Sequence, residues 1–254
     1  MRPRSPATSL KNIAAPFLNP PYDPGCAYSV PYAWLVLGLG YRKSKMKDGQ
    51  IPDSWKWVFE SDRYTVAWMS EPADMIRLGG KYLGYSANAL TPDTIGKVEK
   101  LLTRQAKHVY AFHHDDGQDM LKNGDVDVVI EYSGDIAALM AEDSDIGFVV
   151  PKEGSLRFTD CWAIPKNAPN PDAAHQFLNY MMDAEVGVDI IEAIRYPTPN
   201  EATRALMPES YRDNPAIFPP LSRMEASDFI LWQGADRQRQ FEEAFARVRI
   251  AAGK

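Results

Sequence analysis

The sequence predicts an α/β fold with a mainly parallel sheet. Short apolar runs of strand length alternate with segments whose apolar residues recur at helical spacing, and this alternation is typical of parallel sheets covered by helices. The 254 residues, 45% of them hydrophobic, are enough for one large domain or two modest domains with their own cores. No internal repeat or low-complexity segment interrupts the alternation.

The first half of the chain contains four candidate strands, at residues 28–41, 65–69, 109–112 and 126–132. The first is an aromatic and aliphatic run, interrupted by Pro31, that predicts one or two buried strands. Thr91-Pro92-Asp93 has the composition of a helix start, and Asn123-Gly124 has that of a helix end. Residues 126–132 alternate apolar and acidic side chains with a period of two, which predicts a strand with one exposed face.

The second half continues the alternation with two strands, at residues 146–150 and 158–164, and with helices at residues 136–141, 171–182, 184–194 and 237–250. The helix at 171–182 is expected to pack through an apolar face that includes Phe177 and Leu178, and Asp183 is expected to cap the next helix. The last helix is expected to bury Phe241, Ala244, Phe245 and Val248.

The composition argues against several classes of partner. The net charge is −6 at pH 7 and no basic run follows Arg2 and Arg4, so neither nucleic acid nor an anionic membrane is expected. An acidic protein is better suited to a cationic ligand. The longest apolar run, residues 33–39, is too short to span a membrane. Cys26 and Cys161 are far apart in no CxxC pattern, so independent cysteines are expected, with pairing in an oxidising compartment left open.

Two carboxylates three residues apart follow the apolar run at residues 65–69. Pro72 pre-sets the first turn of a helix, which places Glu71 at the N-cap and Asp74 at the third helical position. Side chains there project from the C-terminal edge of a strand, where open α/β sheets bind small ligands. Taken alone, the pattern favours a simpler role, a capping pair for the free N–H groups of the helix.

Four metal-capable residues are adjacent at His113-His114-Asp115-Asp116. Adjacent side chains after a strand point in divergent directions and no His-x-x-x-His spacing accompanies them, so we predict a solvated loop and no metal site. The chain has no nucleophile elbow, no P-loop and no phosphate-cradling glycine motif. We therefore expect neither a cofactor nor an enzymatic activity.

Eight short motifs occur in a fixed order between residue 10 and the C-terminus. They are Pro31-Tyr32, Pro52-Asp53-Ser54-Trp55, Leu83-Gly84-Tyr85-Ser86, Tyr132-Ser133-Gly134-Asp135, Pro151-Lys152-Glu153-Gly154, Ala163-Ile164-Pro165, Phe177-Leu178-Asn179-Tyr180 and Tyr196-Pro197-Thr198-Pro199-Asn200. In this order they resemble the spermidine/putrescine-binding proteins, the periplasmic substrate receptors of polyamine ABC transporters. The resemblance implies a type II periplasmic-binding-protein fold, in which two α/β lobes joined by crossover strands close on the ligand.

The same resemblance implies a division into lobes. Residues 1–42 would form part of the first lobe, residues 43–153 the second lobe, and residues 154–254 the rest of the first lobe. Whether the C-terminal helices return to the second lobe is left open. Family members begin with a signal peptide and a βα segment of the first lobe, and neither is visible here. An N-terminally truncated chain with an incomplete first lobe is therefore expected.

The resemblance also implies a set of ligand contacts. The family's acidic pair, which holds one amine, corresponds to Glu71 and Asp74 with the two acid lengths exchanged. Its aromatic wall corresponds to Tyr132 and Phe158, and its central carboxylate to Asp160. The further contacts are Tyr196, Gln233 and His114. Carboxylates at intervals, with aromatic faces between them, suit a string of ammonium groups separated by methylenes.

Some of these residues also have a simpler interpretation. By pattern alone, Tyr132 and Phe158 suit the core as well as a ligand wall, and Gln233 suits the surface. Asp160 interrupts an apolar strand, where a buried charge needs a partner.

The remaining expectations for function follow from the resemblance. The ligand is putrescine or spermidine, the partners are the permease subunits of an ABC transporter in the inner membrane, the location is the periplasm, and the expected state is a monomer. Two alternatives are left open. One is a truncated remnant that does not bind, and the other is a receptor for another small solute.

Overall fold

The computed structural model describes residues 8–254, so the expectation for Arg2 and Arg4 lies outside the described residues. The chain divides into two compact units. The first unit consists of Met1–Leu35 and Phe158–Phe218, and the second of Val36–Arg157 and Pro219–Lys254. The lobe boundaries expected from the resemblance stay predictions.

The structure has the predicted alternation of strands and helices. The strands are β1 (Ser29–Arg42), β2 (Val66–Met69), β3 (Val109–His113), β4 (Val128–Tyr132), β5 (Ile146–Val149), β6 (Leu156–Ala163) and β7 (Asp228–Phe229). The α-helices are α1 (Lys56–Phe59), α2 (Pro72–Tyr82), α3 (Pro92–Gln105), α4 (Gly117–Asn123), α5 (Ser133–Glu142), α6 (Pro171–Met181), α7 (Ala184–Ile194), α8 (Glu201–Leu206), α9 (Glu209–Arg212), α10 (Leu221–Glu225) and α11 (Ala235–Ala252).

The sheet is mixed. β2 runs parallel to β3 on one side, with Met69 opposite His113, and parallel to β4 on the other. β1 runs antiparallel to β4 and β5, with Leu37 opposite Tyr132. The hydrogen-bonded order is β3-β2-β4-β1-β6-β7, and β5 also pairs with β1. The parallel part of the sheet therefore brings the C-terminal ends of β3, β2 and β4 side by side.

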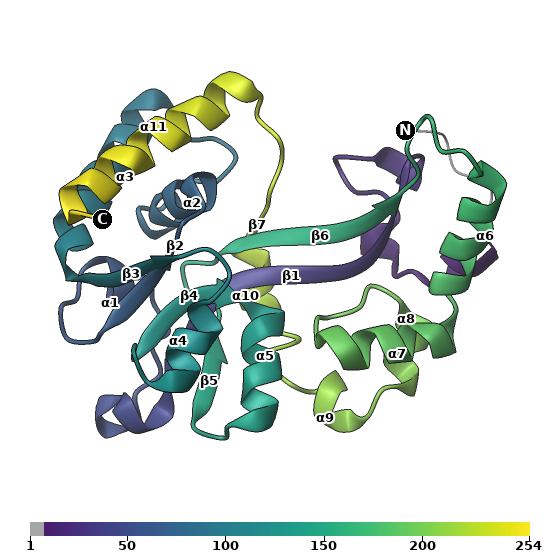
Figure 1. Ribbon diagram of the computed structural model, residues 1–254, viewed down its shortest axis with the longest axis horizontal. Helices are drawn as coiled ribbons and strands as arrows, with labels where there is room; N and C mark the ends of the chain where they lie inside the picture. Colours follow the sequence, from purple (N-terminus) through teal and green to yellow (C-terminus); the bar gives the residue numbers. More distant parts are fainter. Residues whose placement is uncertain (1–7) are drawn as a thin grey trace. The chain divides into compact units, whose positions relative to one another are not determined.

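Helices cover both faces of the sheet in the second unit, with α2, α3 and α11 on one face and α4 and α5 on the other (Figure 1). Successive side chains of β2 point to opposite faces, as a strand requires. Ala67 lies in an apolar cluster with Ile136 of α5. Trp68 packs edge-on against Phe112 at a centroid distance of 6.0 Å, and Phe112 packs against Phe245 of α11 at 5.8 Å.

Helix α11 confirms the pattern expected from the sequence, because its four predicted apolar residues are all buried. They are Phe241, Ala244, Phe245 and Val248. The helix packs against α2 and α3. On its outer side, the Arg247 guanidinium donates two hydrogen bonds to the Glu99 carboxylate of α3, at 2.8 and 2.9 Å. The C-terminal segment thus belongs to the core of the second unit.

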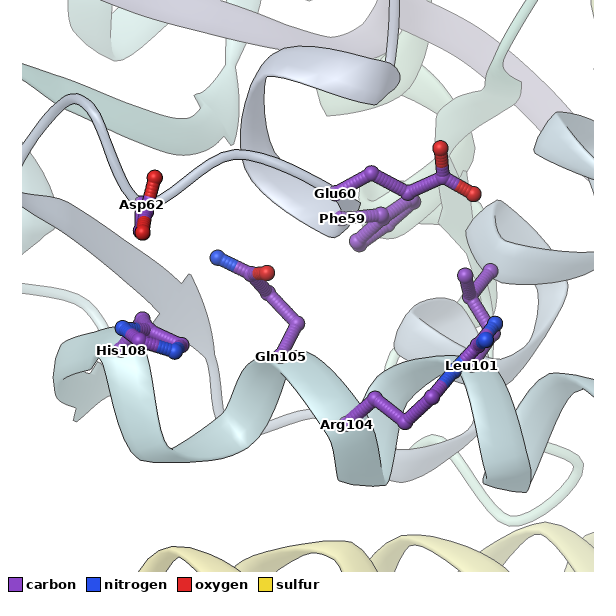
Figure 2. Close-up of a pocket in the computed structure, with 7 residues that line it drawn as sticks. All are labelled: Phe59, Glu60, Asp62, Leu101, Arg104, Gln105 and His108. Carbon is purple, nitrogen blue, oxygen red and sulfur yellow. The ribbon is translucent and has the colours of Figure 1, made fainter.

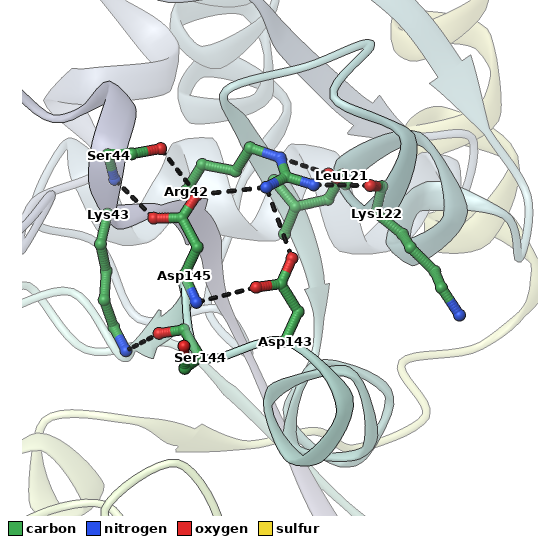
Figure 3. Close-up of polar contacts among 8 residues, drawn as sticks. All are labelled: Arg42, Lys43, Ser44, Leu121, Lys122, Asp143, Ser144 and Asp145. Atoms are coloured by element: carbon green, nitrogen blue, oxygen red, sulfur yellow. Dashed lines mark hydrogen bonds and ion pairs between the residues drawn. The ribbon is translucent and has the colours of Figure 1, made fainter.

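The C-terminal end of β1 is held by a single arginine (Figure 3). The Arg42 guanidinium donates to the Leu121 carbonyl at the end of α4 (2.9 Å) and to the Asp145 carboxylate before β5 (3.1 Å). Asp145 also accepts a hydrogen bond from the Ser44 hydroxyl at 2.6 Å. Because these partners are far apart in sequence, the network fixes three segments of the second unit at one point.

The first unit contains α6 to α9 and is organised by helix caps. Asp183 caps α7, as predicted, by accepting a hydrogen bond from the Glu185 amide at 3.0 Å. Asn200 caps α8 by accepting from the Thr203 amide at 3.0 Å, and its side-chain amide donates to the Met182 carbonyl at 2.9 Å. The Asn200 side-chain amide therefore joins the end of α6 to the start of α8.

Helix α6 departs from its predicted packing. Only Leu178 of this helix is buried, whereas Phe177 is 53% exposed and Tyr180 is 60% exposed. The expectation that Phe177 lies on a buried face is wrong. The helix packs chiefly against the N-terminal segment Thr8–Asn12 and α7, and this packing leaves Phe177 and Tyr180 uncovered.

Both cysteines are free thiols. Cys26 is buried and donates to the Phe17 carbonyl at 3.2 Å, whereas Cys161 is half-buried with its sulfur 3.2 Å from the Tyr22 hydroxyl. Within residues 8–254, the helices are all too short or too polar to cross a membrane.

Candidate functional site

The start of α2 carries the two predicted carboxylates. Glu71 occupies the N-cap and Asp74 the third helical position, as Pro72 predicts. The capping role is wrong for Glu71, because its side chain makes no hydrogen bond to the helix N–H groups. Its Oε2 atom is buried and has no hydrogen-bond partner among the described residues. Burial raises the pKa of Glu71. Among residues 8–254, this oxygen is an acceptor without a donor.

Asp74 is held by two groups at once. It is 8% exposed, and Arg77 Nη1 lies 3.7 Å from its Oδ1 atom. The Tyr132 hydroxyl hydrogen bonds to the same carboxylate. Burial raises the pKa of Asp74 to about 6, although Arg77 and Tyr132 act in the opposite direction. The carboxylate therefore changes charge near neutral pH and would gain from a further cation.

Arg77 is a residue that the sequence reading missed. It is buried, its guanidinium lies 5.0 Å from the centroid of the Phe241 ring, and its pKa is lowered by burial. Its position three residues after Asp74 on one helix face is a readable signal for an ion pair. The arginine compensates part of the charge of Asp74.

Tyr132 and His114 complete a group of side chains at the ends of the three parallel strands. Tyr132 ends β4, is half-buried, and its pKa is raised by burial and by Asp74 and Glu71. His114 follows β3, and its Nδ1 atom lies 3.9 Å from Glu71 Oε1. Glu71, Asp74, Tyr132 and His114 are referred to below as the acidic cluster. The structure thus brings four of the eight predicted contacts together.

Gln233 lies in the second unit, in the segment between β7 and α11. Its amide nitrogen donates to the Asn88 carbonyl, and its Oε1 atom is buried without a partner among the described residues. The Asn88 side chain in turn donates to the Phe229 carbonyl at 2.7 Å and accepts from the Leu231 amide at 3.1 Å. Gln233 is half-buried and fixed, whereas the neighbouring Trp232 is 73% exposed.

The other three predicted contacts belong to the first unit. Phe158 and Asp160 lie on β6, and Tyr196 follows α7. Phe158 and Tyr196 are half-buried, and the Tyr196 carbonyl accepts a hydrogen bond from the Tyr211 hydroxyl at 2.9 Å. Asp160 is exposed, so the expected buried charge inside an apolar strand is wrong. The residues of this end of β6 are all half-buried or exposed, and its carboxylate is not enclosed by a core.

Strand β4 corrects a second prediction. Its residues Val128 to Glu131 are all buried, so the strand has no exposed face. Glu131 is 1% exposed, and its Oε2 atom lies 3.6 Å from Nδ1 of His113, which is also 1% exposed. His113 is therefore buried at the end of β3 and not part of a solvated loop, although its neighbour His114 does point to solvent. The alternating pattern of residues 126–132 gave the wrong prediction because Glu131 is paired inside the protein.

A hollow of about 420 Å³ lies elsewhere in the second unit, between α1 and α3 (Figure 2). It is lined by Phe59, Glu60, Asp62, Leu101, Arg104, Gln105 and His108. Its charged side chains are exposed and of mixed sign, and the buried Gln105 amide donates to the Ser61 carbonyl. Within residues 8–254, His, Cys, Asp and Glu side chains form no group of three or more that could hold a metal ion.

The fold agrees with the comparison to known families. The model of the bacterial extracellular solute-binding protein family matches residues 5–219, and the chain belongs to this family. The chain is 32% identical over 250 residues to the putrescine-binding periplasmic protein of Pseudomonas aeruginosa, covering 91% of this chain and 67% of that protein. It is 30% identical to the putrescine-binding periplasmic protein of Escherichia coli, covering 78% of this chain and 58% of that protein.

A solved structure confirms the fold class. The spermidine/putrescine ABC transporter substrate-binding protein of Streptococcus pneumoniae superposes with a TM-score of 0.87 at 24% identity, over 96% of this chain and 75% of that one. The fold is therefore the type II periplasmic-binding-protein fold, as expected from the order of motifs.

Proposed function

We propose that the chain is the substrate-binding component of a polyamine import system and that it binds putrescine or spermidine. The observation that carries the proposal is the acidic cluster, in which two carboxylates and a tyrosine converge at the ends of parallel strands. Two similar proteins are named as putrescine-binding periplasmic proteins, which supports the same ligand class.

The chemistry of the acidic cluster suits an ammonium group. A charge-assisted hydrogen bond to a carboxylate is among the strongest that a protein can make. Glu71 offers a buried oxygen that has no donor in the described part of the chain, and Asp74 gains from a further cation because its pKa is raised. The ring of Tyr132 adds an aromatic face for the methylenes or for a cation–π contact. Phe158, Asp160, Tyr196 and Gln233 remain predicted contacts of the same ligand.

The proposed role is binding without chemical conversion of the ligand. Proteins of this kind present the ligand to a membrane transporter, so the proposed partners are the permease subunits of an ABC importer and the proposed location is the periplasm. Binding of a ligand that prefers one conformation would shift the protein toward that conformation, which the transporter could read.

Isothermal titration of putrescine and spermidine tests the proposal. We expect saturable binding by the wild-type protein, and Glu71→Gln or Asp74→Asn should each weaken it by roughly 30-fold or more, because a desolvated charge pair loses one partner. Asp93→Asn is the matched control, since it makes the same change in net charge at an exposed side chain of α3. Circular dichroism checks that each variant is folded.

Two outcomes would contradict the proposal. Folded wild-type protein that binds neither polyamine would favour another small solute as the ligand. Equal weakening by Asp93→Asn and Asp74→Asn would mean that net charge, and not the acidic cluster, attracts the polyamine.

A further inference from the structure

The proposed site leaves a buried pair of titratable side chains without a role. His113 ends β3, Glu131 lies in β4, and β2 separates the two strands. The pair therefore reaches across the end of β2. His113 Nδ1 and Glu131 Oε2 face each other at 3.6 Å, just beyond hydrogen-bond distance, and neither atom has a hydrogen-bond partner among the described residues. Burying either group alone would carry a large desolvation cost, so a buried pair of this kind suggests a function.

The start of α4 covers the pair with a glycine. A Cβ atom at Gly117 would lie 2.5 Å from His113 Cε1 and 2.7 Å from Glu131 Oε2. Any side chain at this position would displace one of the two groups. The backbone of α4 therefore sits directly on the pair and seals it from solvent, which agrees with the 1% exposure of both residues.

Hydrogen bonds connect the pair to the strand ends that carry the acidic cluster. Glu131 Oε1 accepts a hydrogen bond from the Tyr132 amide at 2.9 Å. The His113 carbonyl accepts from the Ser70 amide at 2.7 Å, one residue before Glu71. His114 follows His113 directly. Tyr132 is thus bonded to Glu131 directly, Glu71 follows a residue bonded to His113, and His114 is the next residue after His113.

The bond from the ring to β4 sets the tautomer of His113. Its Nε2 atom lies 3.0 Å from the Ile130 carbonyl, and because a carbonyl only accepts, Nε2 carries a proton. A second proton is then carried by the Glu131 carboxyl, which faces Nδ1 at 3.6 Å. Burial raises the pKa of Glu131 to about 8 and lowers the pKa of His113, so near pH 7 the pair keeps this proton and is neutral.

Several charged groups of the neighbouring elements act on the pair. They are Glu71 at the start of α2, His114, Asp115 and Asp116 after β3, and Asp135 of α5. Most of them are acidic, and negative neighbours favour retention of the proton on Glu131.

Resting on the proposed function, we propose that His113 and Glu131 are positioning residues for the ligand's ammonium group. The pair fixes the ends of β2, β3 and β4 relative to one another, and so it fixes the side chains of Glu71, His114 and Tyr132. A group that binds a cation through charge-assisted hydrogen bonds needs its acceptors held within a fraction of an ångström.

Two substitutions of Glu131 separate positioning from general stability. Glu131→Gln keeps an acceptor for the Tyr132 amide and supplies an N–H donor to His113 Nδ1, so putrescine binding should stay within about twofold of wild type. Glu131→Leu leaves the Tyr132 amide without its acceptor, so the Kd for putrescine should rise by about tenfold or more in a chain that remains folded. The control Leu139→Ala, in the apolar cluster between the sheet and α5, should lower the melting temperature without changing Kd.

Binding data alone could overturn the proposal. Wild-type affinity in folded Glu131→Leu would do so, and so would equal weakening by Leu139→Ala and Glu131→Leu, because stability and not position would then control binding. Loss of binding in Glu131→Gln equal to that in Glu131→Leu would also contradict the proposal, since the amide keeps the acceptor for the Tyr132 amide.

A measurement without ligand keeps the proposal separate from the proposed function. In ¹⁵N NMR spectra we expect the His113 ring to be neutral and protonated on Nε2, and Glu131→Leu should shift the amide signals of Tyr132 and Glu71 while Leu139→Ala leaves them in place. If the His113 ring protonates with the ordinary histidine pKa of 6.5, the proposed pairing with Glu131 is wrong. If the wild-type protein binds no polyamine, the proposed function fails, and these amide shifts alone decide whether the pair holds the strand ends.

Discussion

The two units differ in how completely their secondary structure is buried. In the second unit, α11 buries four apolar side chains and the sheet is covered on both faces. In the first unit, α6 buries only Leu178 and leaves Phe177 exposed. The predicted carboxylates follow the same division, because Asp74 is enclosed and Asp160 is exposed. A carboxylate with a shifted pKa and fixed partners requires a surrounding core, and only the second unit supplies one to these residues.

The largest expected effect comes from paired substitutions of phenylalanine in the two units. Phe241→Ala removes a fully buried ring of the second unit that also contacts Arg77, and it should cost about 3–5 kcal/mol of unfolding free energy. Phe177→Ala removes a half-exposed ring of the first unit, and it should change stability by about 0.5 kcal/mol or less. Denaturant unfolding followed by circular dichroism measures both. If both variants lose a similar amount of unfolding free energy, the difference in burial between the two units does not affect stability.

A smaller effect is expected at the cap that organises the first unit. Asn200→Ala removes the acceptor for the Thr203 amide and the donor to the Met182 carbonyl, and it should cost about 1–2 kcal/mol. Asn200→Asp keeps the acceptor and loses the donor, so its cost should be intermediate. Hydrogen exchange of the α8 amides would locate the loss. Unchanged exchange in Asn200→Ala would mean that α8 is held by packing alone.

The pH dependence of binding compares the two carboxylates directly. Asp74 has a pKa of about 6 in the free protein, and a cation favours its ionised form, so protonation should weaken binding as the pH falls below that value. We expect putrescine affinity to drop about tenfold between about pH 7 and about pH 5. Asp74→Asn should bind weakly with a flat profile, whereas Asp160→Asn should keep the slope. A slope that survives in Asp74→Asn would assign the titration to another group.

The sequence is sufficient to predict the elements whose apolar residues all lie on one buried face. The buried positions of α11 and the Thr91 cap of α3 follow from helical spacing and from local hydrogen bonding, and the structure confirms them. Strand β4 fails by the same method. A period-two pattern predicts that Glu131 is exposed. The pattern is local and contains no information about the partner, His113, which comes earlier in the chain on a strand two places away.

The candidate site was predictable in position but not in its interactions. Pro72 locates Glu71 and Asp74 at the start of α2, because proline marks the first helical turn. The hydrogen bond between Asp74 and Tyr132 joins two elements across the sheet, and no local pattern indicates it. The exposure of Asp160 depends equally on what covers β6, which its own strand sequence does not specify.

The six tryptophans differ in exposure, which gives the protein an optical signal of its own. Trp55 and Trp68 are fully buried, Trp34, Trp57 and Trp162 are half-buried, and Trp232 is 73% exposed beside Gln233. An indole in water emits at longer wavelength than one in an apolar core, so a ligand that contacts Gln233 would shift the emission of Trp232 to the blue. The two buried indoles, Trp55 and Trp68, would keep their emission unchanged. Trp232→Phe would remove the shift and leave the other five indoles in place, so unlabelled protein could report occupancy near Gln233 in real time.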